Sequence, residues 1–329
     1  MKQLAKKGFN AKKIFKLVTF ALFFLVYLFF IFSYDWIESS FTALKIFFTT
    51  IFPAVLPYGL TITLIKIFYG ENAFIKRLNK FSVKTLSVNG YTLYSLILGV
   101  ISGYPTGGNL ASKYYLDNKI SLSEASLVFM LTNIPSPLLI ITCIGGITFN
   151  NLTIGILMQG ALIIGTTLTF FIFFTKKTHT YMNFCETKEE FTLINSDNNF
   201  YHIIKSLIIL AGLCSVFYVF ADTLINLPII KAISDLFSNF FGGSTLFNAI
   251  FTGLIETTRG CNEFALLKGP FFMGACILTL TLGGIPTLIF NLKTAKILQI
   301  KTTRLFLFKA LQSITCFFIT YLILLIYLL

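Results

Sequence analysis

The chain has 329 residues, of which 56% are hydrophobic and only 12% are charged, about half the charged fraction of an ordinary soluble domain. A water-soluble fold could not bury that much apolar side chain, so the composition excludes a soluble enzyme. The net charge of +13 does not indicate nucleic-acid binding, because the Lys and Arg residues form short blocks between apolar segments and no continuous basic face.

Apolar segments suited to membrane helices recur along the chain. A spanning helix needs roughly 20 predominantly apolar residues. The clearest segments of this kind are 14–32, 151–174, 201–220 and 305–329. Shorter or interrupted ones are 41–69, 91–103, 122–149, 245–255 and 271–290. The sequence therefore predicts an all-α polytopic membrane protein with about seven to nine full or partial passes.

The basic blocks predict the orientation. Lysines cluster at 2–13, before the first apolar segment, which places the N-terminus in the cytoplasm. That segment is long and no small-residue cleavage site follows it, so we predict a retained helix and no signal peptide. The basic blocks at 76–84, 176–188 and 293–304 are then cytoplasmic, whereas residues 34–40, with Asp35 and Glu38 and no base, fall outside.

One sustained polar segment, 175–200, divides the chain into two membrane halves. The predicted organisation is an N-terminal membrane helix (1–40), a first membrane repeat (41–174), this cytoplasmic loop, a second membrane repeat (201–300) and a C-terminal membrane helix (301–329). Because the first repeat starts inside and ends outside while the second does the reverse, the halves run in opposite senses.

Each half contains interrupted helices. Gly and Pro break the apolar segments at 103–108 and 133–137 in the first half, and at 257–262 and 283–286 in the second. Superposition of the halves aligns residues 107–109 (Gly-Gly-Asn) with 260–262 (Gly-Cys-Asn). Inverted repeats with breaks at matching places are typical of secondary transporters whose site lies near the bilayer midplane. The alternative is that these are ordinary kinks of spanning helices.

Three ionisable residues follow the third break. Glu256, Arg259 and Glu263 are three and four residues apart, so on one helix they would share a face and could pair. Ionisable groups at membrane depth indicate function by default. Arg259 is either a bidentate partner of a substrate carboxylate or a clamp that neutralises its glutamates.

The first break offers a second anion site. Its glycines allow close backbone approach, and a helix predicted at 109–116 would direct free N–H groups toward negative charge. Thr106 and Asn109 add side-chain hydrogen bonds. Ser121 and Glu124 form a capping-box pattern at the start of the next helix, so Glu124 is predicted as a cap and not as a ligand.

No metal or cofactor site is predicted. The six cysteines occur singly and without CxxC spacing, and His179 and His202 flank the polar loop without neighbouring ligands.

The sequence also resembles a known family. The segments 99–110, 121–125 and 133–137, together with 51–57 and 253–260, are similar to the sporulation integral membrane proteins of the YlbJ (stage V sporulation protein V) family, over about residues 41 to 300. This resemblance implies a nucleoside-recognition or Gate domain related to concentrative nucleoside transporters. It also implies movement of dipicolinic acid across the outer forespore membrane during endospore formation.

The expected function is therefore transport of a small organic anion, with dipicolinate first, and not catalysis. A nucleoside or nucleobase transporter and a non-transporting structural protein of spore assembly are the alternatives. A proton or sodium ion as coupling ion, and a homo-oligomeric state, stay open. The predicted substrate-binding residues are Gly103, Tyr104, Pro105, Thr106, Gly107, Gly108, Asn109, Asn133, Pro135, Glu256, Thr257, Arg259, Asn262 and Pro286.

Overall fold

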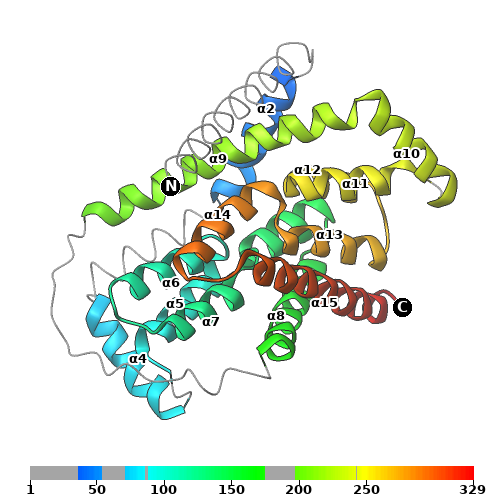
Figure 1. The fold of residues 1–329 in the computed structure, drawn as a ribbon. Coiled ribbons are helices and arrows are strands. Elements are labelled where there is room, and N and C mark those ends of the chain that lie inside the picture. Colours follow the sequence, from blue (N-terminus) through cyan, green and yellow to red (C-terminus); the bar gives the residue numbers. More distant parts are fainter. Residues whose placement is uncertain (1–35, 54–70, 86–87, 175–196, 242) are drawn as a thin grey trace, which may run out of the picture.

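The computed structural model describes residues 36–53, 71–85, 88–174, 197–241 and 243–329, and these residues form an all-helical structure without strands (Figure 1). The predicted first membrane helix at 14–32 and most of the polar loop lie outside the described residues.

Most helices of the first half follow its apolar segments. The described helices of this half are α2 (Trp36–Ile46), the π-helical turn η1 (Phe47–Ile51), α4 (Glu71–Thr85), α5 (Gly90–Ser102), α6 (Thr106–Leu116), α7 (Leu122–Thr132), the π-helical segment η2 (Leu139–Thr148) and α8 (Leu152–Phe174). Of these, α4 instead covers the basic block 76–84, and α6 follows the first break. The capping box at the start of α7 is confirmed, because Ser121 accepts from the Glu124 N–H and the Glu124 carboxylate accepts from the Ser121 N–H.

The described residues of the second half also form helices joined by short turns. The helices of this half are α9 (Asp197–Ile225), α10 (Pro228–Phe241), α11 (Ser244–Ile255), α12 (Thr257–Phe264), α13 (Pro270–Leu282), α14 (Gly284–Ile297) and α15 (Thr302–Leu328). An interruption is present at or beside each of the four predicted places, but most are shorter than predicted, because residues 106–108, 257–262 and 284–286 lie in α6, α12 and α14. The interruptions are called here the first break (103–105), the second break (133–138), the third break (Glu256) and the fourth break (Gly283).

Three helical stretches within the described residues are long and apolar enough to cross a membrane: 152–173, 270–297 and 302–328. A fourth span is possible if 211–225 and 228–239, which meet at 70°, are one broken span. α5, α7, η2 and α11 are apolar but shorter. Short apolar helices that meet at breaks are expected where the backbone faces protein instead of lipid.

Two apolar cores hold the helices together. One lies among η2, α8, α12, α13 and α15, and the other among α4, α5, α6, α7 and α14. Small residues allow the long helices to approach closely, since a Cβ at Gly165 of α8 would lie 2.7 Å from the sulfur of Cys316 on α15. The outer faces of α8 and α15 expose large apolar side chains, among them Ile156, Phe171, Phe318 and Leu322, as a lipid-facing surface does.

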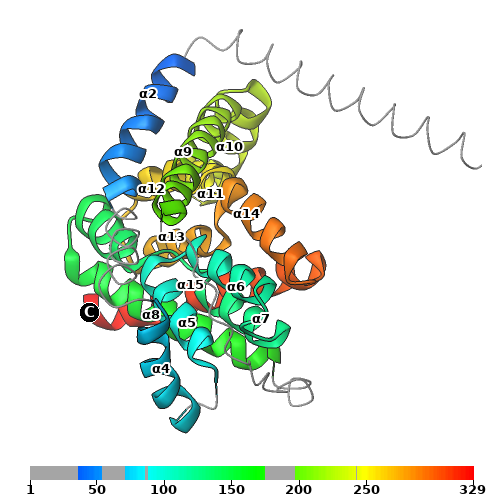
Figure 2. The ribbon, with the colours of Figure 1, turned by 90° about the vertical axis from the view of Figure 1, so that its left-hand side faces the viewer.

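The structure corrects two predicted boundaries. α6 begins at Thr106 and not at residue 109, because Pro105 fits the position before the first helical turn. α9 extends beyond 201–220 in both directions. Residues 36–40, which the basic blocks predict to lie on the outer side of the membrane, form the beginning of α2. This helix lies alongside α9 in both ribbon views (Figures 1 and 2).

Candidate functional site

The first and second breaks are pressed against each other. Gly103 has φ +71, a conformation that suits glycine, and its N–H ends α5 by donating to the Gly99 carbonyl. The next N–H, of Tyr104, donates to the Ile134 carbonyl at 2.9 Å. A Cβ at Gly103 would lie 2.5 Å from the Ser136 nitrogen. The two breaks of the first half therefore form one joint.

α6 begins at this joint, where its first N–H, that of Thr106, donates to the Gly103 carbonyl at 3.1 Å. Its N-cap residue is Pro105, and no side chain caps the helix. Gly107 and Gly108, in its first turn, are buried. The first N–H groups of a helix have no partner within the helix and carry partial positive charge. This helix start is therefore suited to an anionic group.

The N-terminus of α12 is closed by the protein itself. The carboxylate of Glu256, only 1% exposed, accepts from the Arg259 backbone N–H at 2.9 Å and from the Thr258 hydroxyl. The spacing of the two residues predicted an ion pair between Glu256 and the Arg259 side chain. Glu256 is instead the N-cap of α12. Beside it, a Cβ at Gly284 would lie 3.1 Å from the Ile255 carbonyl oxygen, so the third and fourth breaks also meet.

Close glycine contacts join the two helices at each of these starts. A Cβ at Gly107 would lie 2.0 Å from Thr132 Oγ1, and one at Gly99 would lie 2.9 Å from the Gly107 Cα. In the second half, a Cβ at Gly260 would lie 2.3 Å from the Gly253 Cα. Both pairs of broken helices are therefore in backbone contact, which only glycine permits.

A small cavity of about 10 Å³ lies between the first half and α14. Its volume is about that needed by one water molecule. Asn133 is 3% exposed, and neither polar atom of its side chain has a partner among the described residues; the same is true of the Asn291 Nδ2, in a side chain 2% exposed. The lining residues are Tyr104, Pro105, Gly108, Phe129, Thr132, Asn133, Asn291 and Thr294.

These unpartnered amides make the cavity a candidate ligand site. A buried polar group that lacks a hydrogen bond costs free energy, so a native structure keeps one mainly where a ligand or water can satisfy it. The cavity also includes Gly108 of the open α6 N-terminus. Helix amides and carboxamide N–H groups are both donors, as an anion requires.

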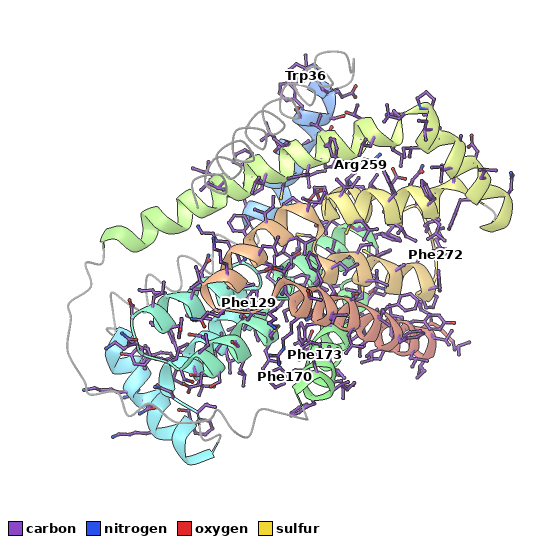
Figure 3. The ribbon with its side chains drawn as sticks, in the orientation of Figure 1. Trp36, Phe129, Phe170, Phe173, Arg259 and Phe272 are labelled. Carbon is purple, nitrogen blue, oxygen red and sulfur yellow. The ribbon has the colours of Figure 1, made fainter. Side chains whose placement is uncertain are left out.

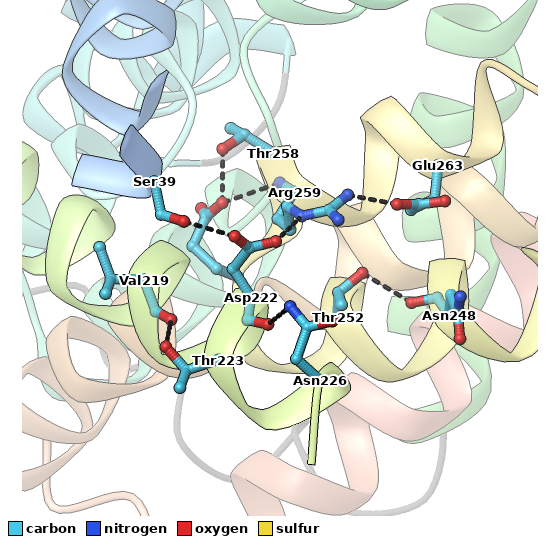
Figure 4. Close-up of polar contacts among 11 residues, drawn as sticks. Ser39, Val219, Asp222, Thr223, Asn226, Asn248, Thr252, Thr258, Arg259 and Glu263 are labelled. Carbon is cyan, nitrogen blue, oxygen red and sulfur yellow. Dashed lines mark hydrogen bonds and ion pairs between the residues drawn. The ribbon is translucent and has the colours of Figure 1, made fainter. Parts of the chain in front are cut away.

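Arg259 lies in a separate, ion-paired cluster. Its Nε donates to Asp222 Oδ1 at 3.1 Å and its Nη1 to Glu263 Oε1 at 2.5 Å, while Ser39 of α2 donates to the other Asp222 oxygen (Figure 4). Figure 3 shows Arg259 between α9 and α12, in a different part of the molecule from Phe129 of the cavity. The predicted pairing with Glu263 is present, whereas the second partner is Asp222 of α9.

A larger hollow of about 380 Å³ adjoins this cluster. That volume lies within the range of small-molecule sites. Its charged lining is balanced, with the carboxylates of Asp222 and Asp235 against the cations of Lys231 and Arg259. The lining residues are Asp222, Ile225, Asn226, Lys231, Ser234, Asp235, Ser244, Asn248 and Arg259.

Tyr104 connects the two regions. It lines the small cavity, and its buried hydroxyl lies near Thr287, Glu256 and Cys261. Glu256 in turn caps the helix that carries Arg259. The first and third breaks are therefore linked through one side chain.

The other predicted site residues are dispersed around these centres. Thr106 starts α6, Pro135 is buried in the second break, Thr257 starts α12, and Pro286 is buried in the first turn of α14. Asn109 and Asn262 are exposed and do not line the cavity.

Three further polar residues at these centres were not predicted from the sequence. They are Asp222, Asn291 and Lys309. Lys309 interrupts the apolar segment 305–329, and an ionisable residue within such a segment is itself a signal. Among the described residues, no group of three His, Cys, Asp or Glu side chains is placed to hold a metal.

Comparison with known proteins gives one relationship. A stretch of 129 residues, 39% of this chain, is 31% identical to the sporulation integral membrane protein YlbJ of Bacillus subtilis (strain 168). The stretch covers 31% of that protein, so the chain matches about a third of the length of its curated relative. No family model and no solved structure matches. The predicted resemblance is confirmed, and together with the apolar helices it identifies an integral membrane protein.

Proposed function

Starting from this similarity to a sporulation integral membrane protein, we propose that the chain is a transporter that acts in sporulation and moves a small organic anion, with dipicolinate as the candidate substrate. The observation that carries the proposal is the small cavity, where an uncapped helix start meets the unpartnered amides of Asn133 and Asn291. Dipicolinate is a flat aromatic dicarboxylate. One of its carboxylates would accept from the α6 N-terminus and from the two carboxamides.

The proposed transporter is built from two inverted repeats, each with a pair of broken helices. Matching contacts support this arrangement, since Gly99 meets Gly107 in the first half and Gly253 meets Gly260 in the second. The contact between Ser39 and Asp222 brings α2 to the C-terminal end of α9, and the proposed topology places both on the outer side. The N-terminus is then cytoplasmic.

The cavity has room for one water-sized group, so we assign the structure to a closed state of the transport cycle. Substrate entry would require α14, which carries Asn291 and Thr294, to move away from α6. The larger hollow at Asp222 and Arg259 would then serve as a vestibule. Its balanced charges would neither repel nor tightly retain an anion.

Uptake into proteoliposomes tests the proposal against its alternatives. Purified protein reconstituted in liposomes should accumulate labelled dipicolinate above protein-free liposomes, and unlabelled dipicolinate should compete. Uptake of labelled nucleoside without dipicolinate uptake would replace the substrate class. Absence of both, with correctly folded protein, would favour a structural role in the spore membrane.

A further inference from the structure

Lys309 is a buried basic residue that joins the two halves of the molecule. It lies on α15, and its side chain is 1% exposed. Its ammonium donates to the main-chain carbonyl of Asn133 at 2.6 Å and to that of Thr281 at 2.9 Å. Asn133 follows the last residue of α7, and Thr281 is in the last turn of α13. The Lys309 side chain thus connects the second break, at the end of α7, with the C-terminal end of α13, just before the fourth break.

The surroundings of this ammonium are unusual for a buried charge. A buried ammonium is costly unless it is paired or well hydrogen-bonded. Among the described residues, no carboxylate lies within ion-pair distance of Lys309, and the titratable side chain beside it is the thiol of Cys316. The carbonyls at helix C-terminal ends carry partial negative charge. These two helix ends therefore supply the compensation.

Carbonyl oxygens at the ends of broken helices are also the ligands that bind sodium in membrane transporters. We propose that the Lys309 ammonium is a resident cation that takes the place of an inorganic ion at this joint. It holds the ends of α7 and α13 together, and the protein needs no sodium for this contact.

A second consequence rests on the proposed function. Asn133 accepts from Lys309 through its carbonyl and is one of the residues that line the small cavity. Lys309 is therefore linked to the proposed carboxylate site through Asn133, and no carboxylate of the described residues pairs with it. Arg259, by contrast, is already paired with Asp222 and Glu263.

Amine rescue of the ligand-free protein tests the resident cation. Lys309→Ala removes the ammonium and leaves space for a small cation, whereas Lys309→Gln keeps an N–H donor without the charge. Lys296, exposed on α14, provides the matched control Lys296→Ala. In detergent, ethylammonium should raise the melting midpoint of Lys309→Ala by about 2–4 °C or more relative to N-methylglucamine. Neither Lys296→Ala nor the unaltered protein should respond, and Lys309→Gln should melt below the unaltered protein.

Two results would overturn the inference. One is a Lys309→Ala or Lys309→Gln protein that melts like the unaltered protein and does not respond to ethylammonium. The other is saturable stabilisation of the unaltered protein by sodium relative to N-methylglucamine. This measurement needs no variant, so it remains decisive if the variants do not fold. Both are measured without substrate, so failure of dipicolinate transport would leave this test intact.

Discussion

The two broken-helix starts, at α6 and α12, differ in what satisfies their N–H groups. α12 carries its own carboxylate, since Glu256 accepts from the Arg259 N–H. α6 has proline at the corresponding place and no side-chain cap. Both starts are held by close glycine contacts to the preceding helix. The framework is therefore similar in the two halves, whereas only the first leaves its positive helix end open to a ligand.

The charged and polar groups around the two helix starts differ in the same way as the caps. In the second half, Arg259 is enclosed by Asp222 and Glu263, so its positive charge is already satisfied. Beside α6, the cavity between the first half and α14 is lined by two residues with unpartnered amide groups, Asn133 and Asn291, and Asn133 accepts from the Lys309 ammonium through its carbonyl. Recognition of the anion is accordingly expected at the α6 start and the cavity beside it, and the cluster at the α12 start is expected to stabilise the structure.

The largest effect is expected from a branched side chain at Gly107. A Cβ there would lie 2.0 Å from Thr132 Oγ1, so Gly107→Val should prevent α6 from packing and abolish folded protein. At Gly108 a Cβ would meet Phe129 at 3.0 Å and Thr294 at 3.2 Å, contacts that side chains can relieve. Gly108→Ala should therefore fold but bind dipicolinate more weakly. Size-exclusion profiles and binding isotherms separate these outcomes, and a well-folded Gly107→Val protein would contradict the packing argument.

A carboxylate introduced at the start of α6 would satisfy its N–H groups from within the protein, as Glu256 does at the start of α12. Thr106 is the first residue of α6, and an acidic side chain is favoured at that position. Thr106→Asp should stabilise the ligand-free protein by about 0.3–1 kcal/mol and reduce dipicolinate affinity about tenfold or more, because the helix start is then occupied and negative. Thr106→Asn, of similar shape and neutral, should bind nearly normally. Equal affinities of the two variants would place the anion elsewhere.

The local features of both halves could be predicted well from the sequence. The long helices α8 and α15 follow directly from their apolar length, and the capping box of α7 from Ser121 and Glu124. The positions of the breaks follow from Gly and Pro, because these residues disturb helical hydrogen bonding in any context.

Contacts distant in sequence could not be predicted in the same way. Spacing along one helix indicates partners three or four residues away, so it identified Glu263 for Arg259 but not Asp222, which is 37 residues away on another helix. Glu256 has the same favourable spacing, yet its carboxylate bends back to cap the helix. The unpartnered state of Asn291 depends on the packing of α14 against α6, which no local pattern encodes.

A smaller effect, of opposite sign for stability and binding, is expected at Asn291. Its Nδ2 is buried without a partner among the described residues, so Asn291→Leu, which keeps the branched shape, should increase the free energy of unfolding by roughly 1 kcal/mol. The same change should weaken dipicolinate binding, because one donor is lost. Denaturation and binding should be measured on the same preparation. A destabilised variant would show that Asn291 has a structural partner instead.

The smallest effect on binding is expected at Arg259, where the two roles suggested by the sequence can be separated. Its guanidinium already binds Asp222 and Glu263, and its carbon Cζ lies 5.9 Å from the Tyr218 ring centre. Arg259→Lys keeps the charge but loses the planar fork, so as a clamp it should cost at most about 1 kcal/mol of stability.

Arg259→Gln leaves the two carboxylates without a cation and should cost roughly 1–3 kcal/mol. Dipicolinate affinity of the folded Arg259→Lys protein should stay within about threefold of the unaltered protein, since the open helix start at α6 is untouched. If Arg259→Lys instead loses affinity while its stability is unchanged, Arg259 contacts the substrate directly. The anion would then be recognised in the second half, and the division of roles between α6 and α12 would be reversed.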